Sequence, residues 1–151
     1  MLNINTEDLS LQIEPVASRF EAPGGPYLEW IDLFVKVAVP GIDAEGNWSA
    51  MPGELKKFWM ELQSMKAGNN FGTSAILSGT ELGLGISLRM LERGLIIMDW
   101  SFQPRPPDGP KISGVCGLDQ TFLDDLMDGV QSLLDFHNCL LYTSDAADDM
   151  Q

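Results

Sequence analysis

The sequence predicts one α+β domain, in which an antiparallel β-sheet of five to six strands carries two amphipathic helices at about 52–67 and 120–136. Apolar and polar residues alternate along several segments, which is the period of strands that bury one face. Two other segments repeat apolar residues every three or four positions, as amphipathic helices do. The strands follow one another in runs, which favours an α+β arrangement over alternating βαβ units.

The first strands are expected over residues 9–20 and 27–39. Leu9, Leu11 and Ile13 alternate with polar residues, and Pro15 marks an edge position or a bulge. The Pro-Gly-Gly-Pro run at 23–26 predicts a turn. A second turn is expected at 41–46, followed by a short strand at 47–50. The long strand places five aliphatic residues on one face: Ile31, Leu33, Val35, Val37 and Val39.

The first helix is expected to begin at Pro52, a residue that suits the first turn, and to stop before Gly68. Further strands are predicted at 71–77, 79–90, 95–102 and 111–117, with a proline-rich loop at 103–110. The second helix is expected to open near Thr121 with a capping box that ends at Asp124. The apolar stripe of the first helix consists of Leu55, Phe58, Trp59, Leu62 and Met65.

The net charge is −13, from 22 acidic and 9 basic residues. Such a chain should be repelled by nucleic-acid backbones and attracted to basic proteins. We find no signal peptide and no membrane-spanning run, and two cysteines are too few for a disulfide framework. The expected location is therefore the cytoplasm.

Residues 139–149, CLLYTSDAADD, resemble one reading frame of a common transposase-based sequencing adapter. On that resemblance the domain spans residues 1–138, and residues 139–151 are an artefactual tail. Without the three aspartates of the tail, 19 acidic residues remain against 9 basic ones, a net charge of −10.

Candidate catalytic and metal-ligating residues are scarce, so we predict no catalytic site, no metal and no cofactor. His137 is the single histidine and has no second ligand at a suitable spacing. Cys116 has no activating histidine near it in the sequence, and a buried structural thiol is the favoured interpretation. The glycines at 79, 83 and 85 lack the Lys-Ser/Thr of a phosphate-binding loop.

A partner-binding surface is the leading functional hypothesis. Trp48, Trp59 and Trp100 are expected in the core. An enzyme that uses Asp32 and Asp99 as a carboxylate pair, and a structural or adaptor module, remain alternatives. The residues that we expect to contact a partner are Trp30, Asp32 and Phe34 on a mixed strand face, and Asp124, Asp125 and Asp128 on a helix.

Several runs resemble WapI-type bacterial immunity proteins and related uncharacterised domains. The most distinctive are Glu54-Leu55 followed by Phe58 and Leu62, and Asp119-Gln120-Thr121 followed by Leu123; the full set adds residues 30–37, 52–62, 94–97 and 117–123. The resemblance covers nearly all of residues 9–136. It implies stoichiometric neutralisation of a cognate toxin, whose basic surface would suit an acidic partner. The oligomeric state is not predicted.

Overall fold

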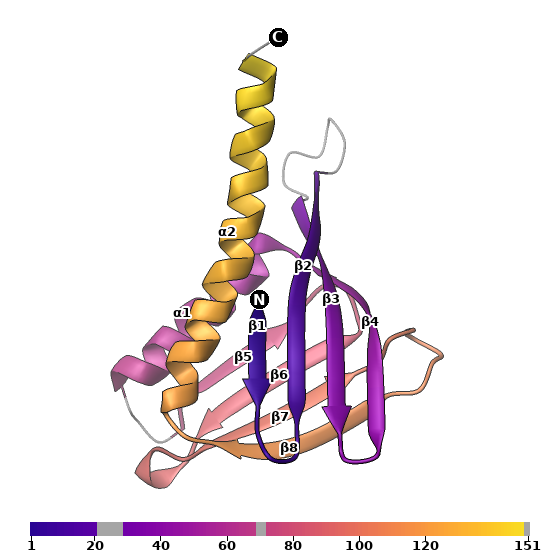
Figure 1. Cartoon of the computed structure of the whole chain (residues 1–151). Coiled ribbons are helices and arrows are strands. Elements are labelled where there is room, and N and C mark those ends of the chain that lie inside the picture. Colours follow the sequence, from indigo (N-terminus) through magenta and orange to yellow (C-terminus); the bar gives the residue numbers. More distant parts are fainter. Residues whose placement is uncertain (21–28, 69–71, 150–151) are drawn as a thin grey trace.

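Over its described residues, the computed structural model has eight antiparallel strands in two separate sheets that cross one another, with both helices along one side (Figure 1). It describes residues 1–20, 29–68 and 72–149, and the side chains of the last helix as far as Cys139. The turn predicted at 23–26 lies outside the described residues.

Sheet A contains the strands β1 to β4 in chain order: β1 (Leu2–Asn5), β2 (Ser10–Phe20), β3 (Glu29–Val39) and β4 (Ile42–Ala50). The register of β2 against β3 shifts between Pro15 and Ala17, which is the bulge that Pro15 predicts. The sequence prediction missed β1, which has only four residues. It also took the first half of β4 for a turn, because Asp43 and Glu45 interrupt the apolar pattern there.

Sheet B contains β5 (Ser74–Ser78), β6 (Leu84–Met90), β7 (Ile96–Phe102) and β8 (Ile112–Leu118), also in chain order. The α+β class, the antiparallel pairing and the two helices are confirmed. The number of strands and the single sheet require correction, because the structure has two four-stranded sheets. Alternation shows which face of a strand is buried, but it does not show which sheet the strand joins.

The inner faces of the two sheets and the buried sides of both helices share one hydrophobic core. Trp48 and Trp100 are buried in it and Trp59 packs against it, as predicted. Strands β3, β6 and β7 contribute alternate residues: Ile31, Leu33, Val35 and Val37; Leu84, Ile86, Leu88 and Met90; Ile96, Met98, Trp100 and Phe102. The opposite face of each sheet therefore points outwards.

Helix α1 (Pro52–Gly68) packs against β5, helix α2 (Thr121–Asp149) packs against β1 and β2, and the helices contact each other. Helix α2 is capped by Asp119 and not by Thr121. The Asp119 Oδ1 accepts a hydrogen bond from the Thr121 amide at 2.9 Å. The helix also continues beyond the predicted end at 136. No Gly or Pro follows Gly129 to stop it. No helix in the described part of the chain is long and apolar enough to cross a membrane.

Candidate interaction surfaces

The three strand residues predicted to contact a partner lie together on the outer face of sheet A. Trp30, Asp32 and Phe34 are alternate residues of β3, and all three are half-buried. Arg19 of β2 lies opposite Trp30, and Ser49 of β4 lies opposite Asp32. The sequence pattern did not predict that these residues are neighbours. The pairing register of β2, β3 and β4 places these five residues next to one another.

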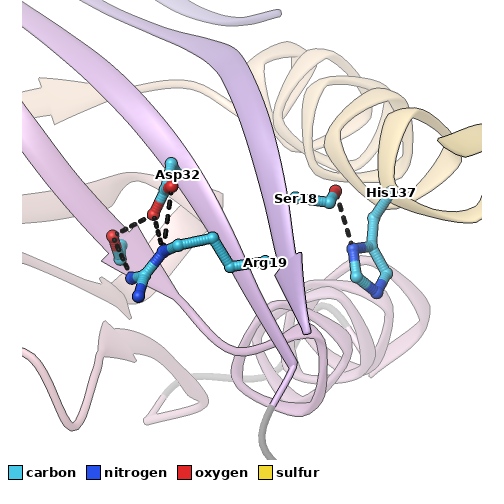
Figure 2. A network of polar contacts seen from close by, with 5 residues as sticks. Ser18, Arg19, Asp32 and His137 are labelled. Carbon is cyan, nitrogen blue, oxygen red and sulfur yellow. Dashed lines mark hydrogen bonds and ion pairs between the residues drawn. The ribbon is translucent and has the colours of Figure 1, made fainter. Parts of the chain in front are cut away.

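Asp32 is held in a hydrogen-bonded network (Figure 2). The Arg19 Nε donates to both carboxylate oxygens at 2.9 and 3.0 Å, and the Ser49 hydroxyl donates to Oδ1 at 2.7 Å. Arg19 also lies over the Trp30 ring, with Cζ 5.8 Å from the ring centroid. The Asp32 charge is thus compensated within the protein, which leaves it little capacity to attract a cation from outside.

The neighbouring aromatic residue is accompanied by a cation in the same way. The Lys36 Nζ lies 5.8 Å from the centroid of the Phe34 ring. The Trp30 Nε1 is buried and has no hydrogen-bond acceptor among the described residues. This end of the outer face therefore combines aromatic surface with balanced charge.

The three helix residues predicted to contact a partner are divided between two sides of α2. Asp124 faces α1, where its Oδ1 lies 2.5 Å from the Lys66 Nζ. Asp125 and Asp128 face β1 instead, and both are exposed. Within the described residues neither has an ion-pair partner.

A hollow of about 530 Å³ separates Asp125 and Asp128 from the outer face of β1. Asn3 and Asn5 of β1 form its opposite wall, and Met1, Phe122 and Gly129 complete it. The two asparagines are not among the predicted partner-binding residues, because the strand that carries them was not predicted.

The polar surface beside this hollow continues across β2 towards the centre of sheet A. Asn3 lies opposite Gln12 on β2, and Glu14, two residues further along β2, lies opposite Phe34. We call the resulting surface the α2–β1 face; its residues are Asn3, Asn5, Gln12, Glu14, Asp125 and Asp128. Three of these six residues are carboxylates, Lys36 of β3 lies opposite Gln12 at the border of the face, and the Met1 ammonium, at the hollow, donates a hydrogen bond to the Ser132 hydroxyl.

The single histidine belongs to a second polar group, on the inner side of the same sheet. His137 of α2 is 1% exposed. Its Nδ1 lies 2.9 Å from the Ser18 Oγ (Figure 2), and its Nε2 lies 2.8 Å from the Glu29 Oε2. The tautomer protonated on Nε2 satisfies both contacts, since it accepts from the serine and donates to the carboxylate.

A serine, a histidine and a carboxylate in line also form the catalytic group of many hydrolases. Here Ser18 lies inside a regularly paired strand, opposite Ile31, rather than on an exposed turn. None of the hollows described here is lined by Ser18. We therefore interpret the group as a structural link between α2 and sheet A.

The other candidate carboxylate, Asp99, lies on the outer face of sheet B, at a hollow of about 430 Å³. Ser87, Ser101 and Ser113 line the same hollow, and Ile76 and Val115 form two of its walls. Asp32 and Asp99 are on the outer faces of different sheets, with the core between them. The structure does not bring them together as a carboxylate pair.

Cys116 is half-buried on the inner side of β8. Burial raises the pKa of its thiol, and the nearby Asp8 carboxylate raises it further. A raised pKa lowers the fraction of nucleophilic thiolate. No group of three or more His, Cys, Asp or Glu side chains that could hold a metal ion occurs among residues 1–20, 29–68 and 72–149.

Comparisons with known proteins provide little further information. No family model and no curated protein sequence matches the chain. Among solved structures, the chain is similar to WHY1 from Arabidopsis thaliana, with 12% sequence identity and a TM-score of 0.49 over 96% of this chain and 90% of that one. A likeness this distant assigns neither a function nor a partner.

Proposed function

We propose that this protein binds a basic protein domain through the α2–β1 face. The observation that carries the proposal is the position of Asp125 and Asp128: they are exposed, without an ion pair among the described residues, and next to a hollow walled by two asparagines. A lysine or arginine side chain that enters the hollow would form charge-assisted hydrogen bonds with the carboxylates, and the side-chain amides of Asn3 and Asn5 lie on the opposite wall.

The overall charge supports the same conclusion. With a net charge of −13 for the whole sequence, or −10 without the tail at 139–151, the protein generates a field that accelerates encounter with a cationic partner. We further propose that the partner is a toxin, and that the protein acts in the cytoplasm as an immunity protein. This finer proposal depends on the resemblance of the Glu54–Leu62 and Asp119–Leu123 segments to WapI-type immunity proteins. Neutralisation would then require occlusion of the toxin and no catalysis.

A charge-reversal experiment tests the proposed surface. If a basic toxin domain is encoded immediately upstream of this protein's gene, that domain is titrated in a calorimeter with the unmodified protein and with the Asp125→Lys/Asp128→Lys variant; a metabolic operon there instead would contradict the toxin proposal. We expect the dissociation constant to rise at least about a hundredfold, because two attractive contacts become repulsive. The control is Asp99→Lys, which reverses an exposed carboxylate on the other sheet and should leave binding nearly unchanged.

Different outcomes test the proposed binding surface and the proposed identity of the partner. Tight binding that only Asp99→Lys weakens would move the interface to sheet B and contradict the α2–β1 assignment. Absence of binding by the unmodified protein, together with no rescue of growth on co-expression with the toxin, would contradict the immunity proposal.

A further inference from the structure

The two sheets have four edge strands, and three of these edges are protected. Helix α2 packs along β1, and α1 packs along β5, where the Glu61 Oε1 accepts a hydrogen bond from the Ile76 amide at 3.1 Å. Strand β4 carries Asp43 and Glu45, and charged side chains discourage edge-to-edge pairing. The edge of β8 differs from the other three.

Strand β8 reads Ile-Ser-Gly-Val-Cys-Gly-Leu and contains neither a charge nor a proline. In the described part of the chain its strand partner is β7 alone, so its other edge offers unpaired backbone donors and acceptors. The Val115 side chain is 64% exposed. Such an edge is a template for another strand.

The sequence around β8 is complementary to itself in one antiparallel register. With a two-fold axis at Val115, Val115 meets Val115 of a second copy, Gly114 meets Cys116, and Ser113 meets Gly117. Ile112 then meets Leu118, and outward-facing residues meet outward-facing ones throughout, because the positions in each pair differ by an even number. Apolar side chains thus oppose apolar ones, and small residues oppose small ones.

The residues just outside the strand extend this match to charge. In the same register Lys111 lies opposite Asp119 of the second copy, and the pair occurs twice because of the two-fold axis. Both side chains are exposed. Asp119 is the acidic residue next to β8, and Lys111 is the basic one. Opposite charges directly across two strands stabilise the pairing.

From these observations we propose that β8 is the interface of a symmetric homodimer, in which two antiparallel β8 strands join two sheets B into one continuous eight-stranded sheet. A second copy fits better than an unrelated strand because the charge match and the small-residue match both require the strand to meet its own sequence. A single strand pair buries little surface and both copies are acidic, so the dimer should be weak and concentration-dependent.

Sedimentation velocity over a range of protein concentrations tests the dimer. The unmodified protein should shift from monomer to dimer as concentration rises. Val115→Lys places two ammonium groups opposite each other and should raise the dissociation constant at least about tenfold. Lys111→Glu should act in the same direction, since it would face Asp119. The matched control is Ile76→Lys, which puts a lysine on the outer face of the protected edge strand β5 and should leave the dimer intact.

A cross-link tests the register itself. In a Cys116→Ser/Cys139→Ser background, Val115→Cys should form an intermolecular disulfide on mild oxidation. Directly opposed residues of antiparallel strands have Cα atoms about 4.5 or about 5.5 Å apart, within the range that a disulfide spans. A protein that stays monomeric at every concentration would overturn the proposal. So would a dimer that Val115→Lys leaves unchanged, or one that Val115→Cys fails to cross-link.

Discussion

At the scale of single residues, His137 shows how the fold changes the meaning of a residue. From the sequence it is an isolated histidine without a second ligand. In the structure it is buried and connects the serine of β2 and the glutamate of β3 to α2. A buried polar side chain with satisfied partners contributes little net energy, but its removal leaves those partners unpaired.

We expect His137→Ala to lower the free energy of unfolding by about 2–3 kcal/mol, because it opens a cavity and removes partners from Ser18 and Glu29. Urea denaturation followed by circular dichroism measures the change. Asn138→Ala, at the adjacent exposed position, is the control and should change stability by less than about 0.5 kcal/mol. Equal stability of the two variants would show that the link does not hold α2 in place.

At the scale of elements, the contact between α2 and β1 determines the shape of the proposed binding surface. Gly129 makes this contact possible: a Cβ built there would lie 2.7 Å from the Leu2 Cδ1 and 2.9 Å from the Leu2 Cα. The helix therefore approaches the backbone of the strand closely. Asp125 and Asp128 are carried by the same part of the helix, and for this reason they lie across the hollow from Asn3 and Asn5.

Gly129→Ala should therefore destabilise the protein by about 1–3 kcal/mol, although alanine is ordinarily the better helix former. The new methyl group meets the Leu2 backbone, which cannot move aside as the end of a flexible side chain can. Gly53→Ala in α1 is the matched control, since no atom lies within 4 Å of its Cβ position, and it should be neutral or stabilising by up to about 1 kcal/mol. Thermal unfolding of both variants decides the comparison, and a stabilised Gly129→Ala protein would contradict the close contact.

Elements with strong periodicity could be predicted from the sequence. The first helix is confirmed to within a residue, and the alternation at Ile86, Leu88 and Met90 marks a strand that buries these side chains. The division into two sheets could not be predicted, because it depends on contacts between distant segments. The hollow was missed for the same reason: Asn3 and Asp125 are far apart in the chain and meet through the packing of α2 on β1.

At the scale of the whole molecule, acidic and basic residues are unevenly placed around an ordinary hydrophobic core. The end of sheet A near Trp30 has its carboxylate neutralised by Arg19, whereas Asp125 and Asp128 of the α2–β1 face have no ion-pair partner among the described residues. The predicted set of partner-binding residues is thus divided by the structure. We assign electrostatic attraction to Asp125 and Asp128, and we assign no such role to Asp32 or Asp124.

Electrostatic binding through the α2–β1 face is tested most directly by the salt dependence of association with the proposed basic toxin domain, followed by stopped-flow fluorescence. We expect the association rate constant to fall steeply as ionic strength rises, because long-range attraction is screened, while the dissociation rate changes less. The Asp125→Lys/Asp128→Lys variant should associate more slowly and show a shallower salt dependence. An association rate that is independent of salt, or a variant with the slope of the unmodified protein, would contradict electrostatic binding through the α2–β1 face.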